Sequence, residues 1–347
     1  MDTESGGRRQ SRIVLVSVLV VFSVAITWAL HTQFAQIALH INKDRFNAPY
    51  VLMYFNTAFM ILCYPIFLLA SKIRGKKAAD AHKRASLVFG DRGFCLLSVL
   101  FKVTPFLLFW IGANYTYAKA LVHVSASIAT SISACNAAEV YVLSIWILND
   151  QFIPFKLLSV VFAVAGVAVI SMGVNGTGSA EWLGVLLAVL SATSAAFYKV
   201  FFKKIVGTAD YGQVSLFMTC LGLLNLILNL PPALILPLTG LELVSWDGIP
   251  WIPLVGAGFL SLLFNFSINF GIAKLHPLVI SVGMLIGIPL NASIDIVFRS
   301  VSPSWSFGGG TALICISFLL IIFPYDAVMK RVSVESTLPK KDSTSDV

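Results

Sequence analysis

The stretch FLLFWIGANYTYAKA, residues 106–120, returns in similar form as SLLFNFSINFGIAKL at residues 261–275. Each copy is an apolar run with an asparagine towards its end, Asn114 in the first and Asn269 in the second. The copies also share a Leu-Leu-Phe triplet and an Ala-Lys pair at the same spacing. This recurrence indicates an internal repeat, and the repeat decides the fold class that the sequence predicts.

The composition places both copies in a membrane. The chain has 347 residues, of which 58% are hydrophobic and only 12% charged, and its mean hydropathy is +0.88. A soluble domain does not reach such values, because its surface must be polar. Continuous apolar runs of about 20 residues, the length of a helix that crosses the hydrocarbon, occur ten times. They lie near 13–41, 49–71, 94–118, 123–148, 154–174, 182–202, 213–238, 249–273, 277–298 and 306–325. We therefore expect an all-α membrane protein with ten transmembrane helices.

The repeat divides these helices into two halves. The offset of 155 residues between the two copies is also the offset between Asn136 and Asn291. We infer homologous halves of five helices each, residues 1–175 and 180–326. An odd number of helices in each half inverts the second half relative to the first, and such inverted repeats expose a central site alternately to the two sides. This arrangement predicts a transporter.

Lysine and arginine are distributed unevenly over the predicted loops. If the N-terminus is cytoplasmic, the inner loops and tails hold 19 of the 24 basic residues, the outer side holds four, and Lys102 lies within a span. Because basic residues favour the cytoplasmic side, we expect both termini there. The loop 72–93 is basic, and the tail 327–347 has the composition of a disordered segment. The net charge of +8 follows from this topology, so nucleic acid is not an expected partner.

Polar side chains inside spans are costly and call for an explanation. Asn136 and Asn291 lie near the middle of spans four and nine, and a carboxylate follows each on the same helix face, Glu139 at i+3 and Asp295 at i+4. We expect all four to face a substrate pathway, in which the acids compensate a cationic solute. The alternative is structural, with the asparagines bonded to neighbouring helices and the acids paired with a lysine.

The first span contributes further candidates. Thr27 and His31 are one turn apart on one face, and Trp28 can stack on a planar or cationic ring. Gln33 is another polar residue of this span. The alternative is an interfacial aromatic side chain and a surface histidine.

The repeated stretch supplies the remaining candidates. Asn114, Tyr117 and Asn269 are predicted to line the same cavity, in which a tyrosine ring offers a stacking platform. Lys199 lies near the inner end of span six, where a lysine usually extends its ammonium group to the interface. Pro105 and Pro289 are expected to interrupt spans three and nine.

No motif of a soluble enzyme is present. The sequence lacks a Walker loop, an H-E-x-x-H motif and a G-x-S-x-G motif. The five cysteines lie singly, without the C-x-x-C spacing of a metal or redox site. We expect neither enzymatic activity nor a cofactor nor a metal.

The segments YKVFFK, NFGIA and IPLNASID resemble a known family. With ten spans in two halves, the chain resembles the drug/metabolite transporter superfamily and, within it, solute carrier family 35, subfamily F. It is most similar to the thiamine-transporter-like members. The resemblance implies a transporter fold, suggests thiamine as one cargo, and supports Asn136, Asn291 and Asp295 as functional residues.

These observations predict a secondary transporter of a small organic solute, cationic and ring-bearing like thiamine. One alternative is a nucleotide-sugar antiporter of a Golgi or endosomal membrane, which would need cations in its cavity. Another is a non-transporting membrane adaptor that acts through the basic loop and tail. The expected partners are a small-molecule substrate and the lipid bilayer, and a homodimer is left open. The plasma membrane and the Golgi or endosomal membranes all remain open as the location.

Overall fold

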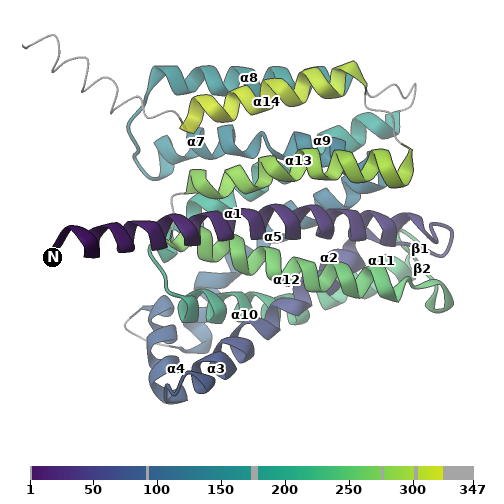
Figure 1. The fold of residues 1–347 in the computed structure, drawn as a ribbon. Coiled ribbons are helices and arrows are strands. Elements are labelled where there is room, and N and C mark those ends of the chain that lie inside the picture. Colours follow the sequence, from purple (N-terminus) through teal and green to yellow (C-terminus); the bar gives the residue numbers. More distant parts are fainter. Residues whose placement is uncertain (1, 91–93, 173–178, 275–276, 301–303, 323–347) are drawn as a thin grey trace, which may run out of the picture.

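The computed structural model describes residues 2–90, 94–172, 179–274, 277–300 and 304–322. The connector between the predicted halves and the predicted disordered tail 327–347 lie outside the described residues. Within these ranges the protein is built almost entirely of helices (Figure 1). The expectation of an all-α membrane protein is therefore confirmed.

The first part of the chain runs from α1 to α8. Its helices are α1 (Asp2–His40), α2 (Pro49–Ala58), α3 (Cys63–Ile73), α4 (Ala78–Ser86), α5 (Leu96–His123), α6 (Ala126–Ser133), α7 (Asn136–Ile147) and α8 (Pro154–Met172). Short 3-10 helices, η1 (Phe59–Leu62) and η2 (Leu87–Phe89), follow α2 and α4.

The second part runs from α9 to α14. Its helices are α9 (Ser179–Val206), α10 (Tyr211–Leu228), α11 (Leu230–Leu238), the 3-10 helix η3 (Trp246–Gly248), α12 (Trp251–Lys274), α13 (Pro277–Arg299) and α14 (Trp305–Ile322). One small antiparallel sheet joins β1 (Phe46–Asn47) to β2 (Leu243–Val244), with Phe46 opposite Val244.

Seven segments among the described residues are long and apolar enough to cross a membrane. They are Leu19–His40, Pro49–Ile73, Leu96–His123, Ala126–Ile147, Glu181–Val206, Tyr211–Leu228 and Trp251–Gly271. Each coincides with a predicted span. The helices α8, α13 and α14 cover the other three predicted spans, which remain predictions.

The interruptions of the helices differ from the prediction. α5 and α13 continue through Pro105 and Pro289, whereas the fourth predicted span is divided into α6 and α7 at Ala134 and Cys135. At this break the Cys135 N–H bonds to the Ile132 carbonyl, a three-residue step that tightens the turn. Asn136 begins α7 immediately after the break. No proline or glycine marks the position, so the local sequence does not reveal it.

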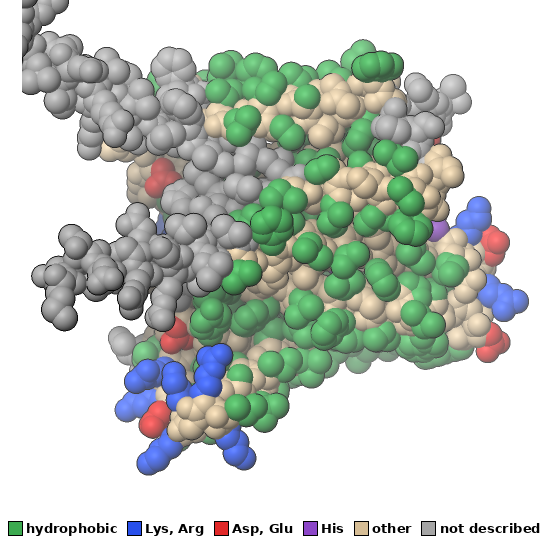
Figure 2. Space-filling view, in the orientation of Figure 1, with side chains coloured by type: hydrophobic (Ala, Val, Ile, Leu, Met, Phe, Trp, Pro, Cys, Tyr) green, Lys and Arg blue, Asp and Glu red, His purple; other side chains and the backbone are tan. Residues whose placement is uncertain are grey.

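The helices are stacked in layers that lie roughly along one direction (Figure 1). α8 packs against α14 at one edge, while α3 and α4 pack against α10 at the other. Between these edges α1 packs against α12 and α13, and α9 packs against α5 and α7. Apolar side chains cover the middle of the face in Figure 2, and Lys and Arg gather at its two ends. This pattern matches a protein whose sides face lipid.

The contact between α8 and α14 depends on two glycines. A Cβ atom added at Gly310 would lie 2.5 Å from the carbonyl oxygen of Gly166, and one added at Gly166 would lie 2.7 Å from the carbonyl oxygen of Gly310. Both distances are shorter than a van der Waals contact. The two backbones approach each other in the way that small residues allow in membrane helix pairs.

Gly310→Ala is therefore expected to destabilise the protein by about 1–3 kcal/mol, because the methyl group forces the helices apart. A thermal melt of the purified protein in detergent measures the effect. Gly308→Ala is the control, since a Cβ atom there meets nothing within 4 Å. Equal melting temperatures for the two variants would contradict the glycine contact.

Candidate functional site

A small cavity lies where α1, α5, α9 and α12 meet. Its volume is about 80 Å³. Five of its lining side chains are aromatic, namely Trp28, Trp110, Tyr117, Tyr198 and Phe264. Since one water occupies about 30 Å³ of liquid, the cavity holds two or three waters and is smaller than the roughly 300–1,000 Å³ of small-molecule sites. In this conformation the space is therefore too small for an organic solute.

The indole of Trp28 is the centre of the aromatic wall. Its ring centroid lies 4.9 Å from that of Tyr117 and 4.7 Å from that of Phe264. The indole N–H is buried and has no hydrogen-bond partner among the described residues. A buried donor without an acceptor is costly, so this group suits an acceptor on a bound molecule.

The predicted cavity residues Asn114, Tyr117 and Asn269 do line this space. Asn114 Nδ2 donates to the Trp110 carbonyl over 2.9 Å, and Asn269 Nδ2 donates to the Asn265 carbonyl over 2.8 Å. Asn269 Oδ1 accepts a hydrogen bond of 3.0 Å from the Tyr198 hydroxyl. Both amides therefore use their donors within their own helix.

Lys199 also lines the cavity, and its expected position at the interface is wrong. The side chain is 8% exposed and donates a hydrogen bond to Asn136 Oδ1. Asn136 Nδ2 in turn donates to the Ala192 carbonyl over 2.5 Å. Asn136 thus joins α7 to α9 and contacts the cavity through Lys199. The rotation of α9 directs Lys199 inward, because a polar acceptor is available there and absent on the lipid side.

Glu139 lies beside this group. Its Oε1 atom accepts a hydrogen bond of 3.2 Å from the Thr193 hydroxyl, and its Oε2 atom has no partner in the described part of the chain. Glu139 on α7 and Lys199 on α9 attract each other electrostatically. Among the described residues, Lys199 supplies the cation on the cavity wall, and it interacts with a carboxylate.

Asn291 belongs to a second polar cluster, centred on Gln33. Gln33 Nε2 lies 3.0 Å from Asn291 Oδ1 and 3.1 Å from Asp295 Oδ1 and donates to both. Asn291 Nδ2 donates to the Thr130 hydroxyl over 3.1 Å, and that hydroxyl also bonds to the Tyr117 hydroxyl, 3.2 Å away. The cluster thus reaches the cavity wall at Tyr117.

Asp295 is fully engaged within this cluster. It is 1% exposed and forms a salt bridge of 2.9 Å with Arg299, one turn later on α13. Its Oδ2 atom accepts a hydrogen bond of 2.9 Å from the backbone N–H of Ser127 at the start of α6. In this conformation the carboxylate joins α13, α1 and α6, and it does not line the cavity.

Two further predicted residues are buried beside the cavity without lining it. Thr27 bonds to the Ser23 carbonyl of its own helix over 2.5 Å. His31 Nδ1 lies 3.0 Å from the carbonyl oxygen of Ala257 on α12. Both side chains are less than 9% exposed, so His31 is not a surface histidine.

The structure therefore brings together Trp28, Asn114, Tyr117 and Asn269, with Asn136 one hydrogen bond away. Sequence reasoning gave no site role to Lys199, Gln33 or Trp110. Lys199 carried one readable signal, because it stands among aromatic residues a full turn before Lys203 and Lys204. Gln33 was noted as a polar residue inside the first span, but nothing in the sequence indicated its partners.

Comparison with known proteins defines the family. A scan against protein-family profiles found no match. Solute carrier family 35 member F3 of mouse is 31% identical to this chain, in an alignment that covers 99% of the chain and 84% of the mouse protein. Member F3 of human is also 31% identical, with 98% and 81% covered, and member F4 of mouse is 30% identical, with 88% and 63% covered. The chain belongs to solute carrier family 35, subfamily F.

Two other comparisons agree with this family. An uncharacterized transporter of Schizosaccharomyces pombe is 25% identical over 88% of this chain. A crystal structure at 15% identity covers 91% of the chain with a TM-score of 0.58, which supports the fold alone. Family 35 membership identifies a multi-pass membrane protein with the role of a solute transporter.

Gln33→Leu is expected to destabilise this family 35 protein by about 1–3 kcal/mol, because the buried Asn291 Oδ1 loses the donor described above and Asp295 loses one of its three donors. Gln151→Leu makes the same chemical change at an exposed position and should stay within about 0.5 kcal/mol of the parent. Thermal melts in detergent compare the two. A Gln33→Leu protein as stable as the control would show that the cluster does not hold the helices together.

Proposed function

We propose that this protein is a secondary transporter that moves a small, ring-bearing organic solute by alternating access through the cavity around Trp28. The observation that carries the proposal is the aromatic cavity itself. It lies between helices from both predicted halves and contains a buried indole donor without an acceptor. Because the space holds only a few waters, admitting a solute requires α1 and α12 to move relative to α5 and α9.

The packing of the helices supports an inverted repeat of two five-helix halves, residues 1–175 and 180–326. α1, the first span of the first half, packs against α12 and α13, which are the third and fourth spans of the second half. α9 packs in the same way against α5 and α7 of the first half. This exchange of equivalent partners is expected of two halves related by a pseudo-two-fold axis.

The hydrogen bonds of the matched asparagines support the same relation. Asn291 accepts from Gln33 of α1, and Asn136 accepts from Lys199 of α9. In each case the donor lies on the first helix of the other half. The ten spans and cytoplasmic termini of the full proposal rest on the apolar runs and on the distribution of basic residues in the sequence.

For the cargo we favour a heteroaromatic cation of the thiamine type. The faces of Trp28 and Trp110 attract a cationic ring, an interaction worth about 2 kcal/mol where it is desolvated. Lys199 opposes a cation, but the neighbouring Glu139 offsets its charge. The polar end of such a solute would accept a hydrogen bond from the Trp28 N–H.

A second candidate cargo is an anionic one, such as a nucleotide sugar. It is favoured by a specific observation, since Lys199 places a buried ammonium group on the cavity wall. An anionic group could replace Asn136 as the partner of this cation. The two cargoes therefore differ in what they require of Lys199.

In liposomes containing the purified protein, we expect uptake of radiolabelled thiamine that Trp28→Leu lowers at least about tenfold, because the variant loses the stacking surface and the donor. Trp246→Leu is the control, since Trp246 is 80% exposed. Uptake no greater than in empty liposomes would refute thiamine as cargo. Equal uptake by the two variants would refute the cavity as its path.

Lys199→Gln distinguishes the two cargoes. Glutamine keeps a donor for Asn136, as Gln33 does for Asn291, but it removes the charge. Uptake of a cation should be retained or increased, whereas exchange of a nucleotide sugar should be lost. Both transports are measured in the same liposomes, and the opposite pattern would make the antiporter the better assignment.

Cysteine labelling tests the proposed orientation. In sealed vesicles with the cytoplasmic face outward, an impermeant maleimide should label Lys77→Cys directly and Lys43→Cys only after detergent is added. Both positions are exposed, and the exposed native Cys95 is first replaced by serine. The reverse pattern would invert the assigned topology.

A further inference from the structure

A much larger pocket than the central cavity opens at the end of the molecule that carries α3 and α4. Its volume is about 990 Å³, and it lies between α3, α4, α10 and α12. The positive-inside distribution assigns this end to the cytoplasm. The residues that line this pocket do not include any of the residues that line the central cavity.

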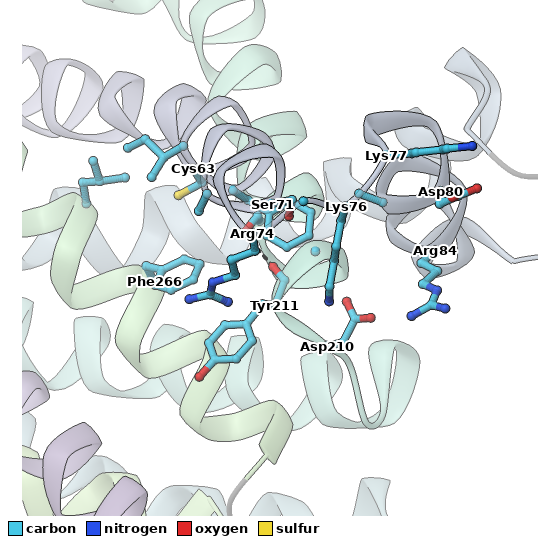
Figure 3. A pocket seen from close by; sticks show the side chains of 18 of the residues that line it. Cys63, Ser71, Arg74, Lys76, Lys77, Asp80, Arg84, Asp210, Tyr211 and Phe266 are labelled. Carbon is cyan, nitrogen blue, oxygen red and sulfur yellow. Dashed lines mark hydrogen bonds between the residues drawn. The ribbon is translucent and has the colours of Figure 1, made fainter.

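Basic side chains line one side of this pocket. They are Arg74, Lys76, Lys77 and Arg84, and the acidic side chains present are Asp80 and Asp210. In Figure 3, Arg74, Lys76 and Arg84 point into the same space, beside Tyr211 and Asp210, whereas Lys77 points away. None of these three inward cations forms an ion pair or side-chain hydrogen bond with another described residue.

The acidic residues do not neutralise this group. Asp210 Oδ1 accepts a hydrogen bond of 2.9 Å from the Gln213 N–H and, with the Gln213 side chain, forms the capping box of α10. Asp80 lies in the first turn of α4, where it faces the positive end of that helix. The pocket therefore retains an excess of positive charge.

The backbone fixes where these cations stand. α3 ends with a hydrogen bond of 3.0 Å from the Lys76 N–H to the Ser71 carbonyl, and Gly75 has a φ of +73°. This is a Schellman end, which needs the left-handed conformation that glycine adopts readily. Arg74 and Lys76 thus flank a defined turn at the mouth of the pocket.

The other side of the pocket is apolar and continues onto the surface that faces lipid. Ile66 is 54% exposed, and Phe259 is 53% exposed. Phe67 packs over Gly212, where a Cβ atom would lie 2.8 Å from its ring. The pocket thus has basic side chains without ion pairs on one side and an apolar wall on the other, at the end of membrane helices. These features fit a molecule with an anionic headgroup and hydrocarbon chains.

We propose that this pocket binds one anionic phospholipid of the cytoplasmic leaflet. Arg74, Lys76 and Arg84 hold its phosphate and headgroup, and its acyl chains lie along α3 and α12 past Ile66 and Phe259. The volume is at the upper end of the range of small-molecule sites, as expected for a headgroup with the first part of its chains. The proposal does not depend on any cargo of the central cavity.

The test is native mass spectrometry of the purified full chain, incubated with equal amounts of phosphatidylserine and phosphatidylcholine. Phosphatidylserine should be retained at least about tenfold over phosphatidylcholine. Arg74→Gln, Lys76→Gln and Arg84→Gln should each lower its retention about fivefold, the effect of one cation at an anionic membrane surface. Lys43→Gln, an equal loss of charge at the other end of the molecule, should leave it unchanged.

Two further measurements separate a lipid site from a soluble-anion site. Ala70→Trp, which fills the apolar part of the pocket without changing its charge, should abolish retention while the protein still melts cooperatively. Glycerophosphoserine, the headgroup without chains, should fail to displace the lipid at equal concentration. The proposal would be overturned if the two phospholipids were retained equally, or if the three glutamine variants retained as much phosphatidylserine as the parent protein. Displacement of the lipid by the headgroup alone would also overturn it.

Discussion

Polar groups inside hydrocarbon must find their hydrogen-bond partners within the protein, and this constraint governs the arrangement of the central helices. Asn136 and Asn291 are buried, and each receives a hydrogen bond from a long side chain of another helix, Lys199 of α9 and Gln33 of α1. These bonds hold α7 to α9 and α13 to α1. The cavity lies between the helix groups that the two bonds define, so its walls depend on them.

The two hydrogen bonds occupy equivalent positions in the two proposed halves, but their donor side chains differ in charge. Gln33 is neutral, and the acid near it, Asp295, is paired with Arg299 on the same helix. Lys199 is charged, and the acid near it is Glu139. Asp295 and Glu139 thus each interact with a cation, and this attraction offsets part of the cost of burying the charges. The aromatic wall around Trp28 lies in this buried region, where a ring attracts a cationic solute more strongly than it does in water.

The ends of the molecule follow a different rule from its middle. Apolar side chains cover the middle and face lipid, whereas Lys and Arg gather at the ends (Figure 2). At the end formed by α3 and α4, the turn at Gly75 places Arg74 and Lys76 on the wall of the large pocket. These basic side chains thereby lie next to the apolar side of the same pocket.

The sequence by itself determined the fold class, the positions of seven spans, and the presence of polar residues within them, because hydropathy and helix length are local properties. It also predicted that Trp28, Asn114, Tyr117 and Asn269 serve one site, and all four line the cavity. The amides were identified because a polar group inside a span needs a partner within the protein. The pairing of Asp295 with Arg299, four residues later on the same helix, was not predicted from the sequence. Only the tertiary structure decided that Lys199 turns inward, that Gln33 bridges Asn291 and Asp295, and that the fourth span breaks before Asn136. The physical reason is that these features depend on how each helix is rotated against its neighbours, and packing between distant segments sets that rotation.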